Sequence, residues 1–504
     1  MKEGRKRIIL KNSFVGLCSQ IISLIMQFFI RMAVLQYIGV EILGITSTIM
    51  SVIQTLSLTE FGFQTTVVYY LYIPLKENDY EKTNQILTIL KRVYEVIGIT
   101  FIGMTILTVP MLQYILKDVE ITGTVIGYYL LMSANNVCSY FGGYKRALLF
   151  ASQEEYISKT IDSIFDIGIS ITSILVILFL KNYMIVLMLH IAQTAGANII
   201  IRRFCRKKYS YLKLEKFNKE LFKTILVDVK NVFLGKMAGY VYGATDNLVI
   251  SSLLGTIYVG YLSNYTVFTV AIKKIVNSIF NAMTPIIGNI LIDSKKNAKG
   301  ETNFRMYTYL RYFLASAIVI PWVLLADDMV KLLFGKQYIL SSTVVILLAI
   351  DLYIHIIYSV CVEYINGSGK FKADKNISII GALVNIVTSL YGVYKMGLEG
   401  VLIGTCISQI FFWLGRGTLV YLKIFKLNLK ALLKYAFKNS IWIIEMIVLI
   451  IFMGYIKNIL PIGNNMLSII IFGGLCEVII ATFHIIFFHF SEEQRNLIKV
   501  LRMR

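Results

Sequence analysis

The sequence predicts an all-α polytopic membrane protein, with about fourteen transmembrane helices in two pseudo-symmetric six-helix lobes plus two C-terminal helices. Two observations predict this class. Of 504 residues, 57% are hydrophobic, and the mean hydropathy of +0.70 lies far outside that of a soluble domain. In addition, apolar runs of about 20 residues, long enough to cross the hydrocarbon core, recur along the chain. The predicted spans are 12–35, 42–70, 94–115, 124–149, 161–180, 183–201, 225–251, 257–284, 307–326, 340–364, 376–394, 399–421, 436–456 and 466–489.

Basic residues concentrate in every second connection between these spans. Six of the 50 Lys and Arg residues fall in the alternate connections: Lys117, Lys181, Lys331, Lys336, Lys395 and Lys457. Six more lie inside spans or at their edges: Arg31, Lys230, Lys236, Lys273, Lys274 and Arg416. The other 38 lie on one side of the membrane, which the positive-inside rule assigns to the cytoplasm together with both termini.

The net charge of +21 would suggest a nucleic-acid partner in a soluble protein. Here the charge sits in short loops, so membrane topology and anionic membrane lipids explain it, and no nucleic acid is expected. The six cysteines and four histidines are scattered without ligand spacing, which predicts neither a disulfide framework nor a metal site. The apolar run after Lys11 is longer than a signal-peptide core, so the first span is expected to be a retained membrane helix.

A glycine pattern indicates that the lobes are duplicated. Four residues separate Gly39 from Gly44, and the same spacing returns 216 residues later at Gly255 and Gly260, each time where one span ends and a long one begins. The predicted domains are an N-lobe of spans 1–6 (1–201), a cytoplasmic amphipathic linker (202–224), a C-lobe of spans 7–12 (225–421), and spans 13–14 with a cytoplasmic tail (422–504). The linker alternates apolar residues with Lys, as an interfacial helix would.

Several segments resemble a known family. They are 31–44, 56–62, 70–76 and 79–82 in the first half, and 245–252 and 260–265 in the second. These segments are similar to the polysaccharide transporter branch of the multidrug/oligosaccharidyl-lipid/polysaccharide exporter superfamily, the flippases of capsule, exopolysaccharide and O-antigen repeat units.

The resemblance implies a flippase in the bacterial cytoplasmic membrane that works by alternating access. Its implied substrate is an undecaprenyl-diphosphate-linked oligosaccharide repeat unit, moved from the inner to the outer leaflet for surface polysaccharide assembly. A polysaccharide polymerase is a candidate partner, and the chain is expected to function as a monomer. No cofactor is expected, although H⁺ or Na⁺ could be a coupling ion. The identity of the sugars does not follow.

Cations inside spans are costly and commonly mark a substrate path. Arginine suits bidentate phosphate contacts and lysine acts as a point charge, so we assign the diphosphate to four of the six. They are Arg31, Lys236, Lys273 and Lys274. Alternatives remain open, since Arg31 could instead pair with Asp246, and Lys230 could extend to the interface.

Polar residues on the same spans are candidates for the sugars and for coupling. Candidates for the sugars are Gln27, Tyr240, Asn247 and Asn264, some of which could simply hold helices together. Candidates for coupling or gating are Glu60, Asp246, Asp351 and His355. Asp351 and His355 lie one helical turn apart and could relay a proton or bind a cation, or could form a satisfied buried pair.

Two other functions are compatible with a polytopic membrane protein of this length. A multidrug-type cation antiporter of the same superfamily would favour acidic, aromatic cavities, whereas this chain places cations in spans 1, 7 and 8. A membrane polysaccharide polymerase or ligase would need a sizeable outer loop, and the longest predicted outer connections are only 116–123 and 327–339. The sequence has no Gly-rich nucleotide loop, so an ATP-driven pump is not expected, and the chain is predicted not to be an enzyme.

Overall fold

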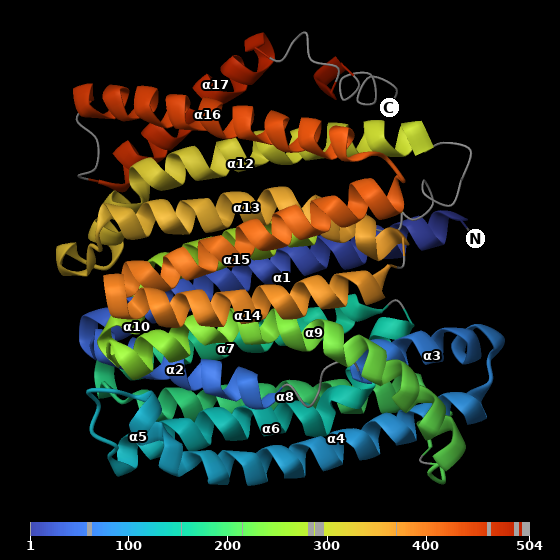
Figure 1. Ribbon diagram of the computed structural model, residues 1–504. Helices are drawn as coiled ribbons and strands as arrows, with labels where there is room; N and C mark the ends of the chain where they lie inside the picture. The colour runs from blue at the N-terminus through green and yellow to red at the C-terminus, as the bar shows by residue number, and fades with distance from the viewer. Residues whose placement is uncertain are drawn as a thin grey trace. The chain divides into compact units, whose positions relative to one another are not determined.

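The computed structural model describes residues 2–57, 63–152, 154–213, 215–280, 287, 297–368, 370–460, 465–487 and 493–495. Within these ranges, side chains are described except at 2–14, 17, 64–65, 228, 231–232, 234–243, 279, 297–299 and 371–372. The described chain is helical almost throughout and contains no strand (Figure 1).

The first half of the chain forms α1 (Lys2–Tyr37), α2 (Val40–Leu56), α3 (Phe63–Glu77), α4 (Tyr80–Thr108), α5 (Leu112–Ile115), α6 (Gly123–Ala151), α7 (Glu155–Leu180), α8 (Tyr183–Lys208) and α9 (Lys219–Leu253). The rest forms α10 (Thr256–Phe280), α12 (Asn297–Leu333), α13 (Ser342–Ser368), α14 (Phe371–Met396), α15 (Leu398–Thr418), α16 (Leu429–Ile459) and α17 (Met466–Phe487). Short turns of 3₁₀ or π helix, η2 (Val109–Met111), η5 (Lys336–Tyr338) and η6 (Leu419–Ile424), complete the described elements.

Every predicted span overlaps a described helix, and the described part of span 42–70 is divided between α2 and α3. Ten described helical stretches are long and apolar enough to cross a membrane. They are α1, α4 with α5, α7, α8, α12, α13, α14, α15 with η6, α16 and α17. The all-α, multi-pass prediction is therefore confirmed. The count of fourteen is approximate, because α2 is short and α6, α9 and α10 are less apolar.

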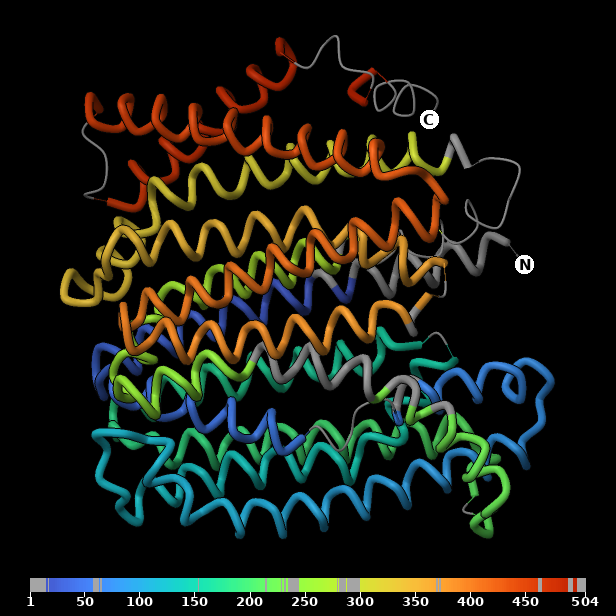
Figure 2. The backbone as a smooth tube through the Cα atoms, viewed as in Figure 1, coloured from blue at the N-terminus to red at the C-terminus, as the bar shows by residue number. Residues whose placement is uncertain are grey.

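The chain divides into two compact units, Met1–Gly260 and Tyr261–Arg504. The core of the first unit gathers fully buried side chains from α2, α3, α4 and α6, among them Ile49, Leu71, Phe101 and Tyr129. In the second unit α13, α14 and α15 lie side by side (Figures 1 and 2). The predicted division into lobes at 202–224 rests on the glycine repeat and stays a prediction.

The two copies of the glycine repeat pack against each other inside the first unit. Gly39 and Gly255 precede α2 and α10 with positive φ angles of 126° and 120°, which favour glycine. A Cβ on Gly44 would lie 2.2 Å from the carbonyl oxygen of Thr256, and one on Gly260 would lie 2.7 Å from that of Val40. The second glycine of each copy therefore lets α2 and α10 touch through their backbones.

The linker differs from the interfacial helix that its sequence predicts. Helix α8 continues to Lys208, α9 begins at Lys219, and the described residues between them are not helical. Side chains of α4 bind this backbone instead. Asn84 donates from Nδ2 to the Tyr211 carbonyl (2.8 Å) and accepts from the Lys213 amide (3.3 Å), and Thr88 Oγ1 accepts from the Glu215 amide (3.1 Å). These tertiary hydrogen bonds replace helical ones between Lys208 and Lys219, so the helix interpretation is wrong for that middle part, whereas 202–208 and 219–224 belong to α8 and α9.

Candidate functional site

A buried polar network lies in the second unit, where α10, α13 and α15 meet. Lys273 Nζ donates to Asp351 Oδ2 at 2.5 Å, and Gln409 Nε2 donates to Asp351 Oδ1 at 2.7 Å. Asp351 is buried, and the Lys273 side chain is 22% exposed. Each carboxylate oxygen thus has its own donor, which is the arrangement that a charge inside apolar helices requires.

The network continues one turn along both helices. Asn277 follows Lys273 by four residues on α10, and His355 follows Asp351 by four residues on α13, so the two pairs form facing rows. Asn277 Nδ2 lies 3.5 Å from His355 Nε2, and the ring of Tyr358 packs edge-on against that imidazole at 5.6 Å. A titratable ring therefore stands beside the ion pair.

Arg416, a further cation within the predicted spans, belongs to a second ion pair nearby. Its Nε donates to Asp374 Oδ1 at 2.7 Å, and its Nη2 donates to Asp374 Oδ2 at 3.3 Å and to Ser378 at 3.1 Å. The guanidinium lies 5.3 Å from the Tyr358 ring centroid, so Tyr358 contacts both the His355 ring and this pair. The contact joins α13, α14 and α15 through charged and aromatic groups.

The structure brings together residues that the sequence assigned to different tasks. Lys273 was predicted to contact a diphosphate and Asp351 to act in coupling, yet the two are bonded to each other. His355 stands beside them, whereas Lys274 is exposed on α10. A substrate anion that approaches Lys273 therefore meets an ammonium already paired with Asp351.

The remaining candidates for the diphosphate and sugars are spread over several helices. Arg31 is half-buried on α1, and Gln27 is exposed on the same helix and donates to Ser23 at 3.0 Å. Asn247 of α9 donates to Ser51 of α2 at 3.1 Å, which favours the role of a helix tie. Asn264 is fully buried on α10.

Four further candidates remain, three of them on α9. Asp246 is half-buried on α9. The side chains of Lys236 and Tyr240 on the same helix, and the whole of Glu60, lie outside the described residues.

Sequence reasoning missed three members of the buried polar interior. Gln409 and Asn277 are amides in apolar helices, and their isolation there was the available signal. Arg311 was placed among the cytoplasmic basic residues, yet it is fully buried on α12. It pairs with Glu363 of α13, and its guanidinium lies 3.7 Å from the Phe280 ring centroid. A count of charges per connection cannot distinguish a buried arginine from a loop arginine.

Comparison with known proteins identifies the family to which the chain belongs. The family model described as polysaccharide biosynthesis protein matches residues 9–291, more than half of the chain. The chain belongs to this family. The predicted resemblance is thereby confirmed.

Two curated relatives match part of the chain. The capsular polysaccharide biosynthesis protein CapF of Staphylococcus aureus is 25% identical over 212 residues, which cover 42% of this chain and 53% of CapF. The uncharacterized membrane protein MJ1068 of Methanocaldococcus jannaschii is 22% identical over 239 residues, 46% of this chain and 44% of that protein. The chain thus spans about half the length of the curated relatives it matches.

Solved structures share the fold at low identity. The lipid II flippase MurJ in an inward closed conformation has a TM-score of 0.67 and 16% identity, covering 94% of this chain and 98% of MurJ. An inward-facing multidrug resistance MATE family transporter of the MOP superfamily has a TM-score of 0.66 and 15% identity, covering 82% and 99% of the two chains. This member of the polysaccharide biosynthesis family therefore has the helical fold of membrane flippases and transporters.

Proposed function

We propose that this protein is a flippase that moves undecaprenyl-diphosphate-linked oligosaccharide repeat units from the inner to the outer leaflet of the bacterial cytoplasmic membrane. The observation that carries the proposal is the family match over residues 9–291 in a chain whose fold follows that of a lipid II flippase along most of its length. The proposal includes alternating access between the lobes 1–201 and 225–421, cytoplasmic termini, and action as a monomer that supplies a polysaccharide polymerase.

The chemistry of the task explains the intramembrane cations. A diphosphate-sugar head that crosses about 30 Å of hydrocarbon would lose the solvation of its charge and several hydrogen bonds. Fixed cations such as Arg31 and Lys274 can replace part of that solvation while the lipid tail stays in the bilayer. The membrane potential, negative inside, assists an anionic head outward by about 2.3 kcal/mol per charge per 100 mV.

The network around Asp351 supplies a coupling element for this cycle. An arriving diphosphate competes with Asp351 for Lys273, so binding of the head and release of the carboxylate are linked. A carboxylate released in this way takes up H⁺ or a cation such as Na⁺, and the Gln409 amide and the His355 ring are close enough to take part. In this cycle Lys273 binds the diphosphate in the substrate-bound state, and Asp351 takes up the coupling ion once Lys273 has released it.

The test is flipping of a fluorescent lipid-diphosphate oligosaccharide in proteoliposomes, scored by access of a membrane-impermeant quencher. We expect Arg31→Ala to slow flipping at least about tenfold, the equivalent of one charged phosphate contact. Lys395→Ala is the matched control, because Lys395 is an exposed cation on α14 outside the proposed path. If both variants flip at the wild-type rate, Arg31 does not contact the diphosphate.

A cation antiporter is the second candidate, favoured by the fold shared with MATE transporters and by the buried carboxylate of Asp351. The same vesicles separate the two functions. Efflux of a cationic dye with no lipid flipping would establish the antiporter. A polymerase or ligase is disfavoured, since the connections 116–122 and 334–341 between described helices leave little room for an outer domain.

A further inference from the structure

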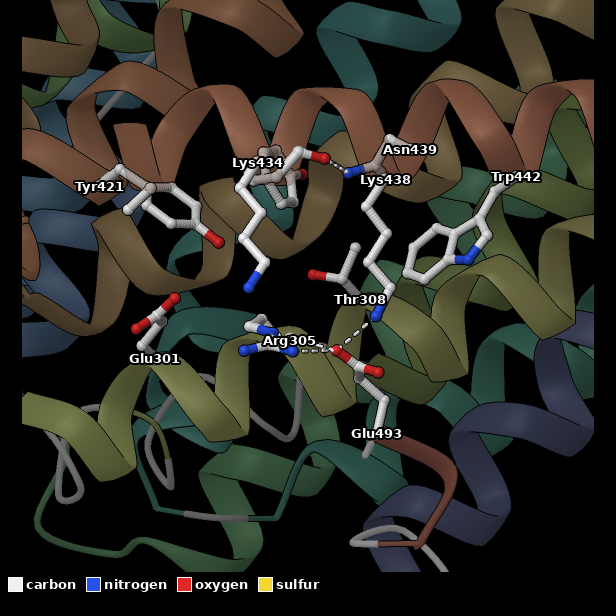
Figure 3. Close-up of a pocket in the computed structure, with 11 residues that line it drawn as sticks. Glu301, Arg305, Thr308, Tyr421, Lys434, Lys438, Asn439, Trp442 and Glu493 are labelled. Carbon is white, nitrogen blue, oxygen red and sulfur yellow. Dashed lines mark hydrogen bonds and ion pairs between the residues drawn. The ribbon is translucent and has the colours of Figure 1, made fainter. Parts of the chain in front are cut away.

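A basic pocket of about 310 Å³ opens in the second unit, and none of the residues in the network around Asp351 lines it (Figure 3). Helices α12 and α16 and the turn η6 supply most of its lining, and Glu493 closes one side. Three lining side chains are basic (Arg305, Lys434 and Lys438) and two are acidic (Glu301 and Glu493). The basic connections to which these residues belong are predicted to be cytoplasmic.

The pocket already holds one anionic group, the Glu493 carboxylate. Its Oε1 accepts from Arg305 Nε (3.0 Å), from Arg305 Nη2 (2.6 Å) and from Lys438 Nζ (2.6 Å). Burial raises the pKa of this carboxyl, but the hydrogen bonds from Lys438 and Arg305 outweigh burial, so the pKa lies below its usual value. An arginine fork and a lysine converging on one oxygen is the geometry with which proteins bind carboxylates and phosphates.

A third cation in the pocket, Lys434, forms no described ion pair with Glu493. Lys434 lies one turn before Lys438 on α16 and extends into the same space, toward Arg305 (Figure 3). It is exposed and forms no ion pair with any residue that the structure describes. Lys438, in contrast, is held in place by Glu493 and by the Trp442 ring, whose centroid is 5.6 Å from its ammonium.

We propose that this pocket binds a phosphate-bearing anion, with Lys434 as the primary contact and Arg305 and Lys438 shared with Glu493. Three cations and two carboxylates leave a surplus of one positive charge, which a phosphodiester complements. The volume exceeds that of a phosphate group and admits a glycerol-phosphate head. A phosphate on a membrane phospholipid and a phosphate on a soluble compound share this chemistry.

The surroundings of Lys434 suit the lipid source. On α16 the neighbouring Leu433, Phe437 and Ile441 are exposed apolar side chains, on which acyl chains can lie while the phosphate reaches the pocket. The inference does not depend on the proposed flippase activity, because it concerns different residues and a resident ligand.

The experiment is native mass spectrometry of the full-length protein with equimolar phosphatidylglycerol and phosphatidylcholine. We expect the wild type to retain phosphatidylglycerol preferentially, and Lys434→Ala to reduce that retention about fivefold, the effect of one basic residue at an anionic surface. Lys430→Ala is the matched control, since Lys430 is exposed one turn earlier on α16 and does not line the pocket. Glu493→Gln removes the competing carboxylate and should raise retention about fivefold.

Competition distinguishes the two sources of phosphate. If added glycerol 3-phosphate and inorganic phosphate leave the bound phosphatidylglycerol in place, the ligand is a lipid head group. Displacement of the lipid by either compound, sensitive to Lys434→Ala, assigns the pocket to a soluble phosphate. Equal losses in Lys434→Ala and Lys430→Ala, or equal retention of the two lipids without phosphate binding, would overturn the proposal.

Discussion

Lys273 of α10 and Asp351 of α13 form a 2.5 Å ion pair in the second unit. Asp351 also accepts from Gln409, so the carboxylate is fully engaged. Neutralising a paired group inside a protein is more costly than removing the pair, because it leaves the partner's charge without compensation.

The first prediction concerns the stability of this pair. Asp351→Asn keeps an acceptor for Gln409 but leaves the Lys273 ammonium unpaired, and should lower the free energy of unfolding by about 3 kcal/mol. The double change Lys273→Met with Asp351→Asn should recover most of that loss. Lys274→Met, at an exposed position, serves as the control and should change the free energy of unfolding by less than about 0.5 kcal/mol. The measurement is denaturant unfolding in detergent; a double variant no more stable than Asp351→Asn would contradict the argument.

The second prediction concerns pH and the segment that carries Glu493. The pKa of Glu493 is lower in the folded protein than in the unfolded chain. Its contribution to folding stability is therefore fully present above the ordinary pKa of 4.5, and it is lost as the pH falls through the lowered pKa. Acidification from pH 4.5 down through the lowered pKa should therefore progressively release residues 493–495 from Arg305 and Lys438.

Hydrogen exchange of peptides covering 493–495, corrected for intrinsic rates, measures this release. Glu493→Gln should show fast exchange at every pH and no transition. A wild-type transition that survives in Glu493→Gln would assign the effect to another group.

The helices could be read from the sequence, but the pairings of buried charges could not. Apolar runs locate most of the helices, because hydrocarbon thickness sets their length, although 42–70 is divided between α2 and α3. Lys273 and Asp351, in contrast, are 78 residues apart, and neither charge nor periodicity states which helices pack together. Arg311 was misplaced for the same reason, since its burial is created by Glu363 and Phe280 from other helices. The middle of the linker is not helical because its backbone forms long-range hydrogen bonds with Asn84, which the local sequence does not indicate.

The third prediction tests that linker contact. Asn84→Ala removes one donor and one acceptor for the backbone at Tyr211 and Lys213, and should expose the linker at a cost of about 1–3 kcal/mol. Limited trypsin digestion should then cut after Lys213 or Lys216 several times faster than in the wild type. Gln113→Ala, an exposed position on α5, should leave the digestion unchanged. Equal cutting of the two variants would mean that Asn84 does not hold the linker.

The fourth prediction concerns the crossing of the glycine repeats. An exposed glycine within a helix normally gains about 1 kcal/mol on replacement by alanine. At Gly44 the new methyl would lie 2.2 Å from the Thr256 carbonyl oxygen, which is backbone and cannot move without separating α2 from α10. Gly44→Ala should therefore lower thermal stability and slow transport, whereas Gly103→Ala on α4, with nothing within 4 Å of the new atom, should be neutral or stabilising. Thermal unfolding of both variants in detergent, together with the vesicle assay, gives the comparison. The expected loss arises from the contact between α2 and α10 and not from helix propensity, so Gly260→Ala should behave like Gly44→Ala. A Gly44→Ala protein as stable as Gly103→Ala would rule out a close backbone crossing.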